Sequence, residues 1–208
     1  MNPQAYILTK LNIISNHDKI AIENQELVEF IVKRITSKKF RKYSIDEDLK
    51  ILIYKVVSDS IINNKPIPFV WVFGGYKLFS LPVAPFVDWA ELFSLLYFAE
   101  WLLPITYLYK PGVVFDFYSD DVIVSQMNNI NPDEINGYLS SFTKLLEFVK
   151  KYLPNNLTFT LNRVIDQYDS LEQFQSELAN NITLLKPKYL NPEYCLTDSQ
   201  RSMIQLNV

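Results

Sequence analysis

The stretch from Trp89 to Tyr109 limits the possible folds more than any other part of the sequence, because it is apolar almost throughout. It is long enough to cross a bilayer as a helix. However, Glu91 and Glu100 lie inside it and Pro104 interrupts it, and a carboxylate near mid-membrane costs a few kcal/mol. The stretch therefore predicts a helix enclosed by other elements of a folded domain, and no association with a membrane.

The composition is that of a single globular domain over residues 1–208. Apolar residues make up 49% of the chain and charged residues 21%, whereas disordered chains are poorer in apolar residues. The formal net charge of -3 argues against nucleic-acid binding, which usually needs a basic excess. Cys195 is the only cysteine, and Met1 to Lys19 has no signal-peptide pattern. We therefore expect a cytoplasmic protein without an internal disulfide.

Hydrophobic periodicity predicts four further helices and a sheet. The helices are expected at Ile22–Lys38, Ser44–Asn63, Asn131–Leu153 and Leu171–Asn181. Ser44 with Glu47 forms a capping-box pattern, and Asn131 before Pro132 is typical of a helix start. Segments rich in β-branched and aromatic residues predict strands at Ile67–Phe73, Val113–Tyr118, Val122–Met127 and Leu157–Leu161. This order indicates an α/β or α+β domain, with about four central strands flanked by helices and a helical N-terminal segment.

Several chemistries lack their usual residues. His17 is the only histidine and lies in a polar stretch, which disfavours catalytic triads and structural zinc. The chain has no GxGxxG or GxxxxGK[ST] motif, so the common nucleotide cradles are absent. What remains is carboxylate and lysine chemistry, which concentrates in residues 66–129.

Two groups of candidate residues lie at the start of this region. Tyr76 and Lys77 follow the first predicted strand, at a position where α/β proteins often place functional groups. A solvent-exposed turn lysine is the alternative for Lys77. Asp88 and Glu91 open the apolar helix, where they can form a capping arrangement. Because that helix is apolar around it, Glu91 is also a candidate acid, base or amine-binding group.

A third group follows the second predicted strand. Strand alternation places Asp116, Tyr118 and Asp120 on one side, and Ser119, Asp120 and Asp121 have the composition of a hairpin turn. The alternative is a metal site in which Asp116, Asp120 and Asp121 hold Mg²⁺ through oxygen ligands, as in a metal-dependent transferase.

The order of short motifs resembles that of the isocyanide synthase family. The motifs are Lys65-Pro66-Ile67-Pro68-Phe69, Gly75-Tyr76-Lys77, Val87-Asp88-Trp89-Ala90-Glu91, Tyr109-Lys110-Pro111-Gly112 and Ser119-Asp120-Asp121. The chain departs from the family pattern in two places: Gly74-Gly75-Tyr76 replaces a Phe-Pro-Phe run, and Asp121 replaces a turn glycine.

The resemblance implies an enzyme that condenses the amine of an amino acid with the carbonyl of a sugar phosphate, without a metal or redox cofactor. It implies Lys77, Glu91 and Asp120 as catalytic residues that share one pocket. Tyr76, Asp88 and Ser119 are then the candidate substrate-binding residues. A non-catalytic binding protein with the same fold remains an alternative.

Overall fold

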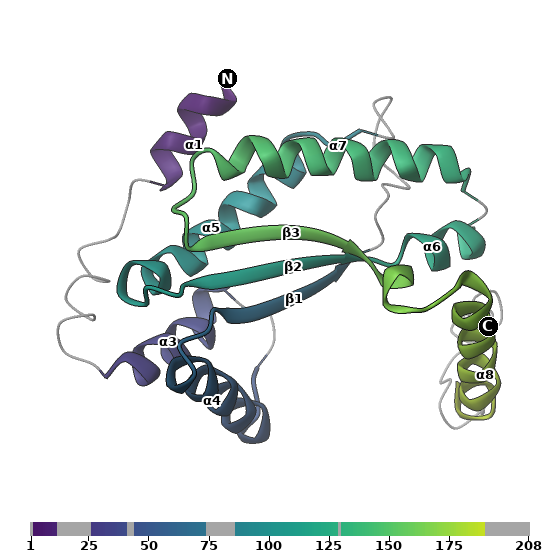
Figure 1. The fold of residues 1–208 in the computed structure, drawn as a ribbon, viewed down its shortest axis with the longest axis horizontal. Helices are drawn as coiled ribbons and strands as arrows, with labels where there is room; N and C mark the ends of the chain where they lie inside the picture. The colour runs from purple at the N-terminus through teal and green to yellow at the C-terminus, as the bar shows by residue number, and fades with distance from the viewer. Residues whose placement is uncertain (1, 12–25, 41–43, 74–85, 129, 190–208) are drawn as a thin grey trace.

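The computed structural model describes residues 2–11, 26–40, 44–73, 86–128 and 130–189 (Figure 1). Its centre is a parallel sheet of three strands in the order β1 (Ile67–Phe73), β2 (Val113–Ser119) and β3 (Leu157–Arg163). Parallel neighbours need crossover connections, which here contain the helices. The fold is therefore α/β, as the sequence predicted.

Two long helices cover one face of the sheet. They are α5 (Trp89–Leu108), between β1 and β2, and α7 (Pro132–Lys150), between β2 and β3. Figure 1 shows both on the same side of the sheet. Alternate residues of β2 are buried against these helices, including Phe115 and Phe117, whose rings pack against Phe98 of α5. This aromatic layer forms the centre of the core.

Shorter helices surround this central unit. Helix α1 (Pro3–Leu11) packs on α5, and α3 (Leu27–Ile35) packs on both α5 and α4 (Glu47–Ile62), which lies beside β1. Helix α6 (Asp121–Asn128), the 3₁₀ turn η2 (Val164–Gln167) and helix α8 (Leu171–Tyr189) lie beyond the ends of β2 and β3 (Figure 1). A further 3₁₀ turn, η1, spans Lys38–Phe40.

The predicted strand Val122–Met127 is wrong, because Asp121–Asn128 forms helix α6. The Asp120 carbonyl accepts a hydrogen bond from the Val124 amide, which closes the first helical turn at 3.1 Å. The hairpin turn expected at Ser119–Asp121 is wrong for the same reason. The β-branched residues favour a strand locally, and the tertiary context overrides that preference. The sheet thus has three strands in the described chain, where we expected about four.

Two helix starts also differ from the prediction. Helix α4 is capped by Asp46, whose carboxylate accepts a hydrogen bond from the Leu49 amide at 2.8 Å, so the expected Ser44–Glu47 capping box does not form. The helix expected at Ile22–Lys38 ends at Ile35, and its predicted first residues lie outside the described chain. By contrast, Asn131 caps α7 as predicted.

Helix α5 is buried along most of its length but is not enclosed on every side. Leu95, Leu96 and Leu102 are buried, whereas Tyr97 and Tyr107 keep 42% and 70% of their surface exposed. The expectation of complete enclosure was wrong because α5 covers one face of a small sheet and α1 and α3 cover only part of its outer side. No helix in the described chain, α5 included, has the length and hydropathy of a membrane span.

Replacing Leu96 with Asp should abolish soluble expression. Leu96 is 3% exposed, and an unpaired carboxylate at that depth costs several kcal/mol, a large part of a typical folding free energy of about 5–15 kcal/mol. The matched control is Tyr107→Asp, on the exposed side of the same helix, which should remain soluble. Folded, soluble Leu96→Asp protein would contradict this placement of α5.

Candidate functional site

The three strands end in one row across the sheet. Phe73 is paired in register with Ser119, and Ser119 with Arg163. Residues paired in this way point to the same face of the sheet, which here is the face covered by α5 and α7. In α/β proteins, ligands bind beyond the carboxyl ends of the strands. This row is therefore the place to look for a site.

An aromatic cavity of about 500 Å³ opens beside this row, between the sheet, α5 and α7. Its apolar wall is formed by Trp71, Phe73, Phe93, Leu95, Tyr97, Phe98, Phe117 and Phe142. The rings of Phe73 and Phe117 both lie against Phe142 of α7, at centroid distances of 5.3 and 5.4 Å. The polar groups on the wall belong to Glu91, Ser94 and Tyr138.

Hydrogen bonds from two different helices hold Glu91 in the cavity wall. Its Oε2 accepts from the Asp88 amide at 2.8 Å, and Asp88 in turn accepts from the Ala90 amide, so the predicted capping box forms. Its Oε1 accepts from the Tyr138 hydroxyl at 3.2 Å. Burial, together with the nearby charge of Glu91, raises the pKa of Tyr138, so this hydroxyl stays protonated and donates. Both carboxylate oxygens are therefore oriented from two different helices.

The sequence predicted a helix over Asn131–Leu153, which contains Tyr138, but gave no sign of the contact between Tyr138 and Glu91. The residues are 47 positions apart. Nothing in either local pattern indicates the contact. A tyrosine among otherwise aliphatic and phenylalanine positions is the only hint, since a buried hydroxyl usually needs a partner.

Ser119 and Asp120 do not line the cavity but are connected to it through Phe73, which is paired in register with Ser119. The Asp120 amide donates to the carbonyl of Phe73 at 3.1 Å, and the ring of Phe73 lines the cavity together with Glu91. Ser119 is fully buried. Within the described residues, neither Ser119 Oγ nor Asp120 Oδ1 has a hydrogen-bond partner, although both atoms are buried. Such atoms usually mark a place where a further donor or acceptor is needed.

Asp121 has a different environment from its neighbour Asp120. Its side chain is 3% exposed and forms an ion pair with Arg163, whose Nη2 lies 2.5 Å from Oδ2 and whose Nε lies 3.2 Å from Oδ1. Hydrogen bonding to Asp121 raises the pKa of Arg163. For Asp120, burial and the charge of Asp121 raise the pKa. Of the two adjacent carboxylates, Asp121 is therefore ion-paired, whereas Oδ1 of Asp120 has no partner in the part of the chain that the structure describes.

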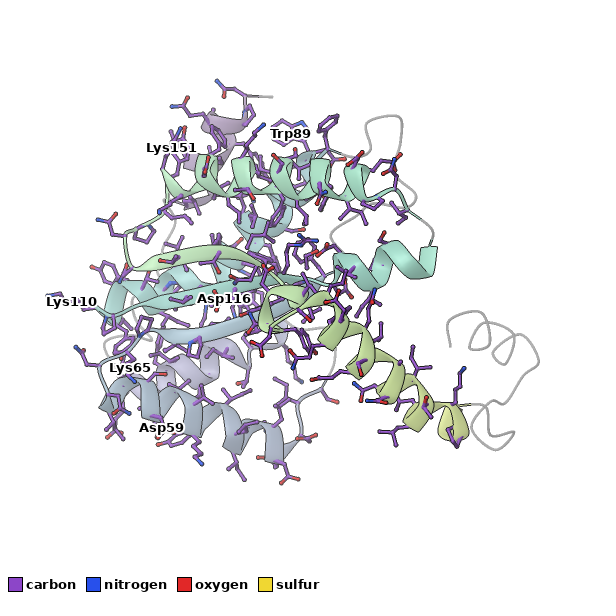
Figure 2. The ribbon with its side chains drawn as sticks, turned by 45° about the vertical axis from the view of Figure 1, so that its right-hand side comes forward. Asp59, Lys65, Trp89, Lys110, Asp116 and Lys151 are labelled. Atoms are coloured by element: carbon purple, nitrogen blue, oxygen red, sulfur yellow. The ribbon has the colours of Figure 1, made fainter. Side chains whose placement is uncertain are left out.

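The alternative metal site does not form. Asp116 points to the opposite face of β2 from Ser119, where it accepts a hydrogen bond from the Thr160 hydroxyl. Figure 2 shows Asp116 in the middle of the sheet, away from the edge at which β2 ends. Asp121 uses its two oxygens on Arg163. No group of three metal-ligating side chains occurs among the described residues, so Asp116, Asp120 and Asp121 do not provide the expected oxygen cluster.

Several residues considered above lie outside the described chain. Among them are His17, Gly74, Gly75, Tyr76, Lys77 and Cys195. The expected convergence of Lys77 with Glu91 and Asp120 is therefore untested for Lys77. Of the other two, Glu91 lines the cavity, whereas Asp120 is not among its lining residues and is connected to it only through the hydrogen bond to the Phe73 carbonyl. Their convergence on one pocket therefore stays a prediction.

The fold is similar to that of a protein of known structure. The crystal structure of the PvcA protein from Pseudomonas aeruginosa superimposes with a TM-score of 0.54 and 19% sequence identity. The match covers 87% of this chain but 62% of PvcA, so the chain spans less than two thirds of that protein's length. At this identity the similarity establishes the fold alone. No protein-family profile and no curated protein matches the sequence.

Replacing Asp120 with Asn should stabilise the protein at neutral and alkaline pH. Because the folded-state pKa of Asp120 is raised, the folded chain binds this proton more tightly than the unfolded chain, and that stabilisation is lost as the pH rises through the folded pKa. Asparagine stays neutral at every pH. Urea unfolding should therefore show Asp120→Asn gaining stability over the wild type at about pH 8, with little difference at about pH 3.

The matched control for this comparison is Asp59→Asn, on the exposed side of α4. It should change the free energy of unfolding by a similar small amount at both pH values. If Asp120→Asn lowers stability at the higher pH, the buried Asp120 carboxylate makes favourable contacts that its described surroundings do not include.

Proposed function

We propose that this chain is an isocyanide synthase-like enzyme that binds an aromatic amino acid in the cavity between the sheet, α5 and α7. The observation that carries the proposal is an aromatic cavity with an oriented carboxylate, Glu91, in its wall. A cavity of about 500 Å³ is of the size that takes small metabolites, and its few polar groups would fix their orientation.

The proposed binding mode follows from the lining of this cavity. An aromatic side chain would pack among Phe73, Phe117 and Phe142, where edge-to-face and offset contacts add to the free energy of burial. The α-amine would lie against the Glu91 carboxylate. Glu91 is oriented for such a contact, because the Asp88 amide and the Tyr138 hydroxyl each donate a hydrogen bond to its carboxylate from different helices.

The proposed reaction is the condensation of that amine with the carbonyl of a sugar phosphate. Nitrogen attacks the carbonyl carbon to give a carbinolamine, which then loses water to give an imine. Glu91 would take the proton that nitrogen gives up, and protonated Asp120 would donate a proton to the departing hydroxyl. Ser119, and outside the described residues Tyr76 and Lys77, are proposed to contact the sugar phosphate. Asp88 would act through Glu91.

Three observations support this assignment. The motifs from Lys65 to Asp121 follow the order of the isocyanide synthases, and the fold is similar to that of PvcA. Phe73, which lines the cavity together with Glu91, also accepts a hydrogen bond from the Asp120 amide. A small-molecule enzyme without a metal or redox cofactor accounts for all of these features.

A second candidate is a non-catalytic protein that binds the same ligand. The observation in its favour is that one Glu91 oxygen accepts a hydrogen bond within the helix cap and the other accepts one from Tyr138 of α7. Such a carboxylate can serve as a fixed anchor for an amine without any proton transfer. Binding and turnover measurements on one substitution separate the two candidates.

Glu91→Gln tests the proposal most sharply. Isothermal titration calorimetry should show that wild-type protein binds L-tyrosine or L-tryptophan more tightly than L-alanine. Glu91→Gln should preserve that binding while slowing the turnover of amino acid and pentulose phosphate about 10²-fold or more, as followed by mass spectrometry. Glu100→Gln is the matched control, since Glu100 lies on the same helix, outside the cavity lining, and pairs with Lys39.

The other outcomes are also informative. Binding lost together with turnover would make Glu91 an amine anchor and not a base. Binding without any turnover in the wild type would favour the non-catalytic candidate. A wild-type protein that binds neither aromatic amino acids nor pentulose phosphates contradicts the proposal.

A further inference from the structure

We propose that Arg163 is a positioning residue, which holds Asp121 so that Asp120 alone of the two adjacent carboxylates remains free to act at the cavity. This inference rests on the proposed function for the role of Asp120 in a reaction. The geometry on which it is built does not depend on that reaction.

The first support is the position of the pair. Arg163 is the last residue of β3, and Asp121 is the first residue of α6. Their ion pair therefore joins the end of one strand to the helix that follows the neighbouring strand. Asp120 is the single residue between the end of β2 at Ser119 and this anchored helix start, and register pairing places Ser119 directly beside Arg163. The pair thus fixes the backbone on the C-terminal side of Asp120.

The second support is how completely the pair is bonded. Both Asp121 oxygens accept from the guanidinium, and Asp121 is almost fully buried. The Arg163 side chain is 39% exposed, and its backbone amide donates to Asp166 at 3.3 Å, which fixes the start of η2. Two donors in a planar fork hold a carboxylate in one orientation, which a lysine cannot reproduce.

The third support is the contrast with Asp120. Its backbone is held by Phe73 through its amide and by Val124 through its carbonyl, yet Oδ1 is buried without a partner among the described residues. Burial raises the pKa of Asp120, and the negative charge of the neighbouring Asp121 raises it further, so Asp120 keeps its proton to higher pH. Environments that separate two carboxylates in this way are typical of acid and base pairs.

The charged and titratable groups around Asp120 come from several elements. Asp121 lies on α6, Arg163 on β3 and Asp166 in η2. Across the cavity, Glu91 lies on α5 and Tyr138 on α7. Of these, the charge of Asp121 is the one that acts directly on Asp120, and Arg163 is its partner.

The test is the titration midpoint of the Asp120 carboxyl, followed by carbon-13 NMR in folded protein without ligand. Arg163→Met removes the cation beside two adjacent carboxylates, which then share one proton, so the upper titration midpoint of the pair should rise above the Asp120 midpoint of the wild type. The double variant Asp121→Asn with Arg163→Met removes both charges, and the midpoint should fall below that of the wild type. Arg163→Lys keeps the charge and should lie between Arg163→Met and the wild type.

These variants separate a positioning role from a merely structural one. A structural pair would change the unfolding midpoint in urea and leave the Asp120 titration unchanged in every folded variant, which would overturn the proposal. If Arg163→Met does not fold, the double variant and Arg163→Lys still give opposite expected directions. Asp169→Asn, at an exposed position before α8, is the control and should leave the Asp120 midpoint unchanged.

A turnover measurement then links the pair to the proposed reaction. The folded double variant should bind an aromatic amino acid as the wild type does and react about 10²-fold more slowly. The reason is that Asp120, the proposed acid, is no longer held in position and has an altered pKa. Unchanged turnover with a shifted Asp120 titration would overturn the positioning role in catalysis. Absence of turnover in the wild type would instead contradict the proposed function. The titration without ligand would still decide whether Arg163 sets the titration midpoint of Asp120.

Discussion

The parallel register of β2 with both of its neighbours is the constraint on which the rest of the structure depends. It aligns Phe73, Ser119 and Arg163 in one row at the carboxyl end of the sheet. Parallel pairing also requires a crossover after β1 and another after β2, and these contain α5 and α7. The same two crossovers that cover the sheet therefore bring Glu91 and Tyr138 together above Phe73 and Phe117.

The site combines an aromatic cavity with polar groups that are held from several elements. Glu91 is oriented by its own helix and by Tyr138, and Asp121 is oriented by Arg163. Asp120 and Ser119 are the exceptions, since each has a buried side-chain oxygen without a described partner. Unpaired buried polar atoms beside well-ordered ones are expected where a ligand completes the hydrogen bonding, and this contrast is the structural basis of the proposed function.

The sequence predicted the local features of the fold better than the long-range ones. Apolar periodicity and capping residues identified α5, α7 and the Asp88–Glu91 cap, because these depend on neighbours three or four positions away. Helix α6 was predicted as a strand, since its Val-Ile-Val run has β propensity and the bond from Val124 to Asp120 that starts it depends on tertiary context. Tyr138 and Arg163 were missed because their partners are 47 and 42 residues away.

The most direct test of the central claim is a crystal structure of the protein with bound L-tyrosine. The account predicts the ring in the cavity against Phe73, Phe117 and Phe142, and the α-amine within hydrogen-bonding distance of Glu91. The Asp88 amide and the Tyr138 hydroxyl should remain bonded to that carboxylate. An amino acid bound elsewhere on the molecule, or bound in the cavity with its amine directed away from Glu91, would contradict the account.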